Sequence, residues 1–300
     1  MANDKMMTQM SSKDGFIAAL DQSGGSTPGA LRLYGIPDSE YSGDAEMFRL
    51  MHEMRVRIIT APAFNGSKVI AAILFERTMD GEAKGKPVPT YLWAERGVVP
   101  IVKVDKGLEA AKDGVRLMKA MPDLDALCAR AGKLGVFGTK MRSVIDLASK
   151  DGIAAIARQQ FAFGEQIARH GLVPILEPEV SINSPDKGGA ETMLLAELMK
   201  GLDALPAGRK VMFKLTLPEV PDFYAPLVKD ERVVRVVALS GGYTRAEACR
   251  RLAQNHSVIA SFSRALTQDL RRSMSDAEFN KALAEAIDEI YQASAEKVAA

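Results

Sequence analysis

The residue best suited to covalent chemistry in this chain is a lysine that interrupts an apolar run. Lys214 lies within KVMFKLTL, directly between Phe213 and Leu215. A charged ammonium is costly to bury in such a run, so burial near other lysines would favour the neutral amine. A neutral lysine amine can form an imine with a carbonyl substrate. The alternative is a structural lysine that pairs with Glu177 or Glu179 in a polar interior.

Other polar residues occupy the same kind of position along the chain. An apolar run is closed or interrupted by one such residue at seven places: Asp21, Lys103, Lys140, Glu177, Lys214, Ser240 and Arg264. If the runs are parallel strands of a barrel, their carboxyl ends surround one mouth. We therefore expect these side chains to converge on one site, although each of them alone is weak evidence.

A pair of carboxylates follows one of these runs, in the segment Glu177-Pro178-Glu179. Side chains alternate along an extended segment, so both carboxylates should face the same side. One could exchange protons during imine formation while the other stays ionised against the lysines. A solvated turn after a strand is the alternative for this segment.

Two Gly/Ser segments suit phosphate groups. Ser240, Gly241 and Gly242 lead into a helix start at Thr244, where free backbone N–H groups favour an anion. Arg264 is a natural bidentate partner for the same phosphate. The second segment, DQSGGS, ends at Ser26 and follows the first apolar run. Two such segments at one mouth indicate a substrate with two phosphates.

The pattern that must position these residues is an alternation of apolar runs with amphipathic stretches. The runs are continuously apolar, as expected for parallel strands covered on both faces. They end at Asp21, Glu76, Asp105, Lys140, Glu179, Leu217, Gly242 and Arg264. The helical patterns cover Asp44–Arg55, Gly107–Met121, Ser143–His170, Glu191–Leu205, Arg245–Gln254 and Asp276–Lys297.

This alternation predicts an α/β fold, a single (β/α)8 TIM barrel over residues 1–300, since such barrels typically take about 250 residues. A doubly wound open sheet is the second choice. Capping-box sequences begin helices at Thr244 and Ser275. Long surface loops are expected at Tyr34–Asp44 and Met79–Tyr91.

Composition narrows the function classes. With 39 basic and 38 acidic residues the net charge is +1, so nothing indicates a nucleic-acid or membrane partner. No two of the three histidines have metal-ligand spacing, so neither a metal nor a cofactor is expected. Cys128 and Cys249 are expected to be helix-packing residues. We expect a soluble, cytoplasmic protein, and the sequence leaves its oligomeric state open, a homo-oligomer included.

Taken in order, the motifs resemble those of class I, or Schiff-base, fructose-1,6-bisphosphate aldolases along nearly the whole chain. The motifs that carry the resemblance are AALDQSGGS at 18–26, GVVPIVKVDKG at 97–107, GTKMR at 138–142, PILEPE at 174–179, MFKLTLPE at 212–219, LSGG at 239–242 and SFSRAL at 261–266.

The resemblance implies roles for the residues at this mouth. Lys214 would be the Schiff-base lysine, Glu177 the acid/base of carbinolamine chemistry and Glu179 its support. Asp21 would accept the proton from the C4 hydroxyl, helped by the charge of Lys140. The phosphate on C1 would be held by Ser240, Gly241, Gly242, Ser261 and Arg264. The phosphate on C6 would be held by Ser23, Ser26, Lys103 and Arg142.

Three features depart from that family's pattern. Gln22 and Ser263 stand where many members carry Glu and Gly. The leader before the first strand is short. Animal members end in a mobile tail with a tyrosine, whereas here Tyr291 lies within a helical pattern. Glu177 or water is therefore expected to reprotonate the enamine.

Two other functions stay open at this point. A related Schiff-base lyase could act on a different sugar phosphate, and the Asp21 and Lys103 ends of the site would distinguish it. A non-catalytic sugar-phosphate-binding protein could keep the same fold, although a pure binder has no need of a lysine inside an apolar strand.

Overall fold

Eight parallel strands form a nearly closed barrel in the computed structural model, which describes residues 2–298. The main-chain N–H of Ala19 donates to the carbonyl of Phe262 at 3.1 Å, which joins the first strand to the segment after the last. The barrel prediction is confirmed, and the open-sheet alternative is excluded. In order around the barrel the strands are β1 (Phe16–Leu20), β2 (Val69–Leu74), β5 (Val99–Lys103), β7 (Gly138–Ile145), β8 (Val173–Val180), β9 (Val211–Thr216), β10 (Val233–Leu239) and β11 (Ile259–Ala260).

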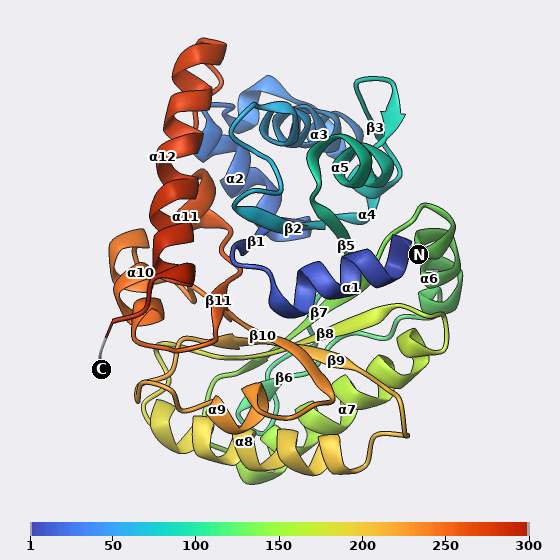
Figure 1. The fold of residues 1–300 in the computed structure, drawn as a ribbon, viewed down its shortest axis with the longest axis vertical. Helices are drawn as coiled ribbons and strands as arrows, with labels where there is room; N and C mark the ends of the chain where they lie inside the picture. The colour runs from blue at the N-terminus through green and yellow to red at the C-terminus, as the bar shows by residue number, and fades with distance from the viewer. Residues whose placement is uncertain (1, 299–300) are drawn as a thin grey trace.

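Helices connect the strands and cover the outside of the barrel (Figure 1). Such crossovers are what parallel strands require. The connecting helices are α2 (Thr27–Tyr34), α3 (Gly43–Thr60), α4 (Glu76–Met79), α5 (Val88–Arg96), α6 (Leu124–Lys133), α7 (Lys150–Ala168), α8 (Lys187–Asp203), α9 (Ala225–Val228) and α10 (Arg245–Ala253). Two more helices, α11 (Arg264–Thr267) and α12 (Asp276–Ala295), follow the last strand.

Helix α1 (Ala2–Ser12) closes the end of the barrel where the strands begin, and Figure 1 shows it lying across them. Met6 and Met10 pack with apolar residues of the barrel interior, including Ile17 and Ile70. The Gln9 amide donates to the carbonyls of Ile70 and Gly97 at 2.7 and 2.8 Å. This helix was not predicted from the sequence, because its apolar residues are few and are separated by polar ones.

Alternation along the strands sorts side chains between the interior and the outer layer. Ile17 and Ala19 of β1 belong to the interior cluster, as do Val173 and Ile175 of β8 and Met212 of β9. Continuing the same two-residue step along each strand reaches Asp21, Glu177 and Lys214. The interior is therefore apolar near α1 and becomes polar at the carboxyl ends of the strands.

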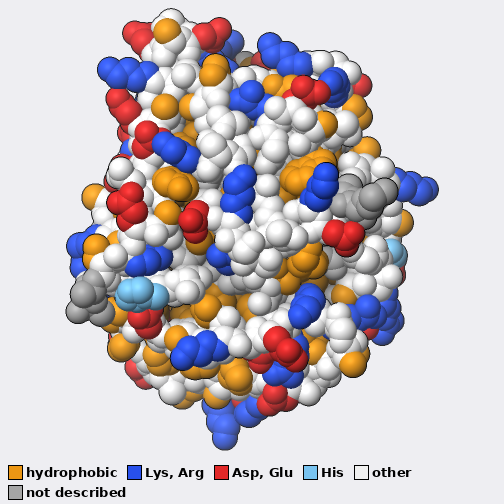
Figure 2. Space-filling model, viewed as in Figure 1, with side chains coloured by type: hydrophobic (Ala, Val, Ile, Leu, Met, Phe, Trp, Pro, Cys, Tyr) orange, Lys and Arg blue, Asp and Glu red, His pale blue; other side chains and the backbone are white. Residues whose placement is uncertain are grey.

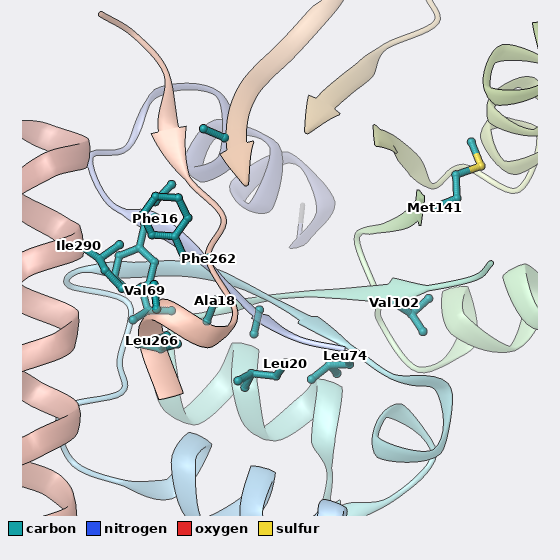
Figure 3. Packing of buried hydrophobic residues seen from close by; sticks show 14 of the residues in the cluster. Phe16, Ala18, Leu20, Val69, Leu74, Val102, Met141, Phe262, Leu266 and Ile290 are labelled. Carbon is teal, nitrogen blue, oxygen red and sulfur yellow. The ribbon is translucent and has the colours of Figure 1, made fainter. Parts of the chain in front are cut away.

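The outer faces of the strands pack beneath the helices. Figure 3 shows Phe16, Val69, Phe262, Leu266 and Ile290 grouped together. These fully buried residues come from β1, β2, the segment after β11, α11 and α12. The last helix thus covers the place where the barrel closes.

The predicted helix at Gly107–Met121 is wrong. Gly107, Asp113 and Gly114 have φ values of 97°, 52° and 73°, in the left-handed region that ends a right-handed helix. The segment instead forms β6 (Val115–Arg116), which pairs antiparallel with β7. The helix of this crossover, α6, begins only at Leu124.

Two other predicted boundaries also need correction. The pattern at Ser143–His170 begins in β7, and α7 starts at Lys150 after an N-cap at Ser149. The loop predicted over Met79–Tyr91 contains a short hairpin of β3 (Glu82–Ala83) and β4 (Lys86–Pro87), and then the start of α5. Gly85 has a φ of 73°, which makes the hairpin turn possible. Strands of two residues are too short to give a periodic pattern, so the hairpin could not be predicted from the sequence.

Of the two predicted capping boxes, the one at Ser275 is complete. The Ser275 hydroxyl accepts a hydrogen bond from the N–H of Glu278, and the Glu278 carboxylate accepts one from the N–H of Ser275. Thr244 accepts from the N–H of Glu247, but the carboxylate of Glu247 binds Arg250 and Arg251 instead.

The surface charge agrees with the nearly equal numbers of basic and acidic residues in the sequence. Basic and acidic side chains are interspersed on the face shown in Figure 2. No helix within residues 2–298 is long and apolar enough to cross a membrane.

Cys128 and Cys249 are free thiols in α6 and α10, and burial raises the pKa of each to about 12. They are packing residues, as predicted.

Candidate active site

A cavity of about 760 Å³ opens at the carboxyl ends of the strands. Every site residue predicted from the sequence lines it, so residues from seven separate strands and the segments that follow them do converge. The lining residues among them are Asp21, Ser23, Ser26, Lys103, Lys140, Arg142, Glu177, Glu179, Lys214, Ser240, Gly241, Gly242, Ser261 and Arg264.

Lys214 lies at the buried base of the cavity wall and is 4% exposed. Its Nζ is 3.3 Å from Oε1 of Glu177, and this is its only ion pair within residues 2–298. The other oxygen of Glu177 lies 2.8 Å from Nζ of Lys140, although this contact lacks hydrogen-bond geometry. Lys140 therefore supplies the closer positive charge, and the Lys214 amine is the less engaged of the two.

Lys140 and Asp21 form the shortest ion pair at this base, with Nζ 2.6 Å from Oδ2. Burial alone would raise the pKa of Asp21, but Lys140, Lys214 and Lys103 hold that pKa well below its usual range. Burial likewise opposes the charge of Lys140, but Asp21 and Glu177 raise its pKa above the usual value. Asp21 is thus ionised and Lys140 protonated at neutral pH.

Lys140 lies inside its strand and does not close it, because β7 continues to Ile145. The added residues pair with β8 up to Val180 and, on the other side, with β6. The longer strand places Arg142 two residues beyond Lys140 on the same face.

A second layer of charges lies closer to the mouth. Arg142 Nε is 2.5 Å from Oε2 of Glu179, while the N–H of Arg142 donates to Oδ2 of Asp105 at 3.2 Å. Lys103 Nζ lies 2.8 Å from Oδ1 of the same Asp105. Asp105 was not predicted as a site residue, although it closes the third apolar run. Glu177 and Glu179 face the same side, as the alternation predicted.

The Gly/Ser segment after β10 has the backbone that only glycine adopts easily. Gly241 and Gly242 have φ values of 60° and 112°. A Cβ on Gly241 would lie 2.8 Å from a methyl carbon of Ile182, so a larger residue would have to displace the side chain of Ile182 in the loop after β8. No side chain covers the main chain where these two glycines border the cavity, so an anion can approach their backbone closely.

Two polar side chains next to this segment have no partner within residues 2–298. Ser261 is 1% exposed and lines the cavity, and its hydroxyl makes no hydrogen bond to any described residue. The guanidinium of Arg264 forms no ion pair or hydrogen bond in the part of the chain that the structure describes. A buried hydroxyl and a free guanidinium at one cavity wall suit an anionic ligand.

The segment after β1 forms a short 3-10 turn, η1 (Gly24–Ser26). The hydroxyl of Ser26 donates to the carbonyl of Ser23 at 3.0 Å and accepts from its N–H at 3.1 Å. Ser23 and Ser26 both line the cavity, on an exposed turn.

Two further residues at the site were not predicted. Arg55 of α3 is buried beneath Gln22, where it donates to the Gln22 carbonyl and to Oγ1 of Thr78. Burial lowers the pKa of Arg55 to about 10, and nearby Asp21 opposes this shift. Ser263 accepts a hydrogen bond from Gln22 and lines the cavity. The amphipathic pattern of α3 does not distinguish Arg55 from other residues of the helix, whereas Gln22 and Ser263 stand out in the sequence as departures from the family pattern.

Tyr291 lies in α12, as predicted, and far from this mouth. Its ring centroid is 5.6 Å from Nζ of Lys68, which directly precedes β2 and so lies at the opposite end of the barrel. Among residues 2–298 no three His, Cys, Asp or Glu side chains are grouped so that they could hold a metal ion.

Comparison with solved structures supports the fold. A structure of fructose-bisphosphate aldolase from Plasmodium falciparum, in complex with TRAP and a small-molecule inhibitor, superposes with a TM-score of 0.77. The match covers 99% of this chain and 96% of that one, at 20% sequence identity.

Sequence comparisons extend over nearly the whole chain. The family model described as fructose-bisphosphate aldolase class I matches residues 8–192. A fructose-bisphosphate aldolase class 1 of Synechocystis sp. is 56% identical over 292 residues, covering 97% of each chain. One from Porphyromonas gingivalis is 51% identical and covers 97% of this chain and 99% of its own. With the fold, the lysine and the carboxylates already in place, these matches show that the chain belongs to the class I fructose-bisphosphate aldolase family.

Proposed function

We propose that this protein cleaves fructose 1,6-bisphosphate reversibly to dihydroxyacetone phosphate and glyceraldehyde 3-phosphate through an imine on Lys214. The observation that supports this most directly is the buried Lys214 amine, 3.3 Å from a carboxylate oxygen of Glu177. Imine formation needs a nucleophilic amine beside a group that can exchange protons with it. Family membership supports the same reaction.

Glu177 is the acid/base of the first stage. It accepts the ammonium proton of Lys214, and the free amine attacks the C2 carbonyl to give a carbinolamine. Glu177 then protonates the departing hydroxyl, and water leaves as the imine forms. Lys140 on the second oxygen of Glu177 stabilises its carboxylate form before the first transfer and after the second.

Asp21 is the base of the cleavage stage. It accepts the proton of the C4 hydroxyl as the C3–C4 bond breaks and the aldehyde forms. The electron pair of that bond moves into the protonated imine, giving an enamine on Lys214. Lys140 keeps Asp21 ionised before the transfer and stabilises the developing charge.

The same cavity offers positions for two phosphates. Ser240, Gly241, Gly242, Ser261 and Arg264 surround the position for the phosphate on C1. Lys103 and Arg142, with Ser23 and Ser26, surround the position for the phosphate on C6. Asp105 and Glu179 hold Lys103 and Arg142 in place, so these two cations keep a defined geometry without a ligand.

Glu177 is also the group that we expect to reprotonate the enamine, with water as the alternative. The reaction belongs to glycolysis and gluconeogenesis, and a cytoplasmic location stays a prediction. A Schiff-base lyase for another sugar phosphate is the second candidate function. It would share Lys214 and Glu177 but would not depend on the C6 phosphate.

Borohydride trapping tests the proposal. The protein is incubated with dihydroxyacetone phosphate, reduced, digested and analysed by mass spectrometry. A reduced adduct on the peptide that contains Lys214 is the expected result. If folded protein at saturating ligand gives no adduct, the imine mechanism is wrong and a binding protein becomes the better explanation.

A further inference from the structure

Gln22 and Ser263 connect the two ends of the barrel at its mouth. Gln22 follows β1 and Ser263 follows β11, and the two are 241 positions apart in the sequence. The Gln22 amide nitrogen Nε2 donates to the Ser263 hydroxyl Oγ at 2.7 Å. Both residues border the cavity that holds Lys214.

Arg55 fixes which way the Gln22 amide points. This arginine is 1% exposed, and its Nη2 lies 3.4 Å from Oε1 of Gln22 while also donating to the Gln22 carbonyl. A guanidinium is a donor only, so the amide oxygen must face Arg55 and the amide NH2 must face Ser263. The opposite orientation would set one donor against another.

The orientation of Gln22 in turn determines what Ser263 can do. A hydroxyl has one proton to donate, and Ser263 already accepts from Gln22. Within residues 2–298 the Ser263 hydroxyl donates to no protein group. Its proton is therefore free to point into the cavity that Ser263 lines.

In the sequence, Ser263 lies between two residues whose polar side-chain groups have no partner within residues 2–298. The buried Ser261 hydroxyl has no hydrogen-bond partner, and the Arg264 side chain is free among the described residues. Three donors within four consecutive positions, with no carboxylate paired to any of them, match the several acceptor oxygens of one phosphate.

We propose that the Ser263 hydroxyl donates a hydrogen bond to the phosphate on C1 of the substrate, with Gln22 and Arg55 as the positioning residues that keep its proton directed into the cavity. The proposal rests on the proposed function, because it takes the ligand of this wall to be the phosphate of the keto-sugar half. A glutamate at position 22 would act against it. Its carboxylate would accept the Ser263 proton and leave none for the phosphate.

The test compares two ligands that form the same imine. Dihydroxyacetone phosphate carries the phosphate, and dihydroxyacetone does not. For each, the concentration that gives half-maximal borohydride trapping on Lys214 is measured in the wild type and in variants. Ser263→Ala should raise this concentration roughly tenfold for dihydroxyacetone phosphate, as expected for a lost hydrogen bond to a charged group. It should leave the value for dihydroxyacetone unchanged.

Two further variants test orientation and fold. Ser263→Thr keeps the hydroxyl and should restore the wild-type value. Gln22→Glu retains the size of the side chain and gives Arg55 an ionised partner, so the fold should be preserved. It should nevertheless weaken the binding of dihydroxyacetone phosphate as much as Ser263→Ala does. The double variant should bind this ligand no more weakly than either single variant.

The other outcomes overturn the inference. If Ser263→Ala leaves trapping by dihydroxyacetone phosphate unchanged, Ser263 does not bind the phosphate, and the proposed function stands. If Ser263→Ala weakens the binding of both ligands equally, Ser263 has only a structural role. If Gln22→Glu has no effect while Ser263→Ala does, Gln22 is not a positioning residue. If the wild type is trapped by neither ligand, the proposed function fails and the inference fails with it.

Discussion

Nζ of Lys140 lies 2.6 Å from Oδ2 of Asp21, and both groups are buried at the base of the cavity. Lysine and aspartate come from β7 and from the end of β1, which are not neighbouring strands in the barrel. The pair therefore spans the interior. Among the three lysines that lower the pKa of Asp21, Lys140 is the foremost.

Lys140→Met should move the acid limb of the pH profile of kcat/KM to higher pH. Burial raises the pKa of Asp21 and Lys140 is the foremost group that opposes it, so removal of Lys140 lets that pKa rise. Activity at neutral pH should fall by about 10²–10³-fold, because a charge that stabilises the transition state is also lost. Lys103→Met removes a weaker opposing charge and should shift the limb less. An unshifted limb in Lys140→Met would argue against Asp21 as the base.

Lys214→Met should reduce cleavage by about 10⁴-fold or more, because methionine retains the side-chain shape without the nucleophile. Circular dichroism should show an unchanged fold. Lys187→Met is the matched control, since Lys187 is an equally buried lysine, paired with Glu191 outside the cavity. It should lower stability but leave trapping on Lys214 intact. Full activity in Lys214→Met would refute the assignment.

Arg142→Ala should raise KM for fructose 1,6-bisphosphate by roughly tenfold or more, because a charged contact to the C6 phosphate is lost. KM for fructose 1-phosphate, which lacks that group, should change little. Arg116→Ala is the control, since Arg116 forms a similar ion pair with Asp146 outside the cavity lining. Equal changes for both substrates would place Arg142 outside the C6 site.

EDTA should leave cleavage unchanged. In the proposed reaction the protonated imine on Lys214 accepts the electron pair of the broken bond, so no metal is needed for that task. Initial rates with and without prolonged dialysis against EDTA provide the measurement. Strong inhibition that a divalent metal reverses would contradict this mechanism.

The stability of the wild type should rise relative to Lys297→Met between about pH 7.5 and about pH 9.5, by about 2 kcal/mol in the free energy of unfolding. Burial lowers the pKa of Lys297 to about 8, and the charge of Asp222 opposes this shift. Above pH 8 the native amine is neutral while the unfolded lysine stays protonated up to its usual pKa near 10.5. The unfolded state then binds more protons, so increasing pH favours the native state. Urea unfolding at the two pH values measures the difference, and a pH-independent difference would be the contrary result.

The barrel was predictable because its strands are apolar on both faces and its helices are amphipathic. Runs such as the one that ends at Glu179 need no tertiary information to be recognised as strands. The segment 107–121 could not be predicted in this way, because its amphipathic pattern is that of a helix, while left-handed residues at Asp113 and Gly114 prevent one. Helix α1 was also missed, because only the open end of the barrel gives Met6 and Met10 a surface to cover.

For the site, the sequence identified residue types that are unusual in apolar strands, and the cavity contains all of them. The identity of their partners depends on three-dimensional proximity. Nothing in the local sequence indicates that Asp105 contacts both Lys103 and Arg142, or that Arg55 lies beneath Gln22. Gln22 and Ser263 each looked like an isolated departure, and only the fold shows that they are hydrogen-bonded to each other.

The closure of the barrel has a consequence for synthesis of the chain. The last strand, β11, has only two residues, and a hydrogen bond from Ala19 to Phe262 joins the segment after β11 to β1. A nascent chain carries Lys214 and Glu177 before these closing residues have left the ribosome. Arg264 and the carbonyl that closes the barrel are synthesised after Lys214 and Glu177. The complete cavity therefore cannot form around a nascent chain that lacks its last residues.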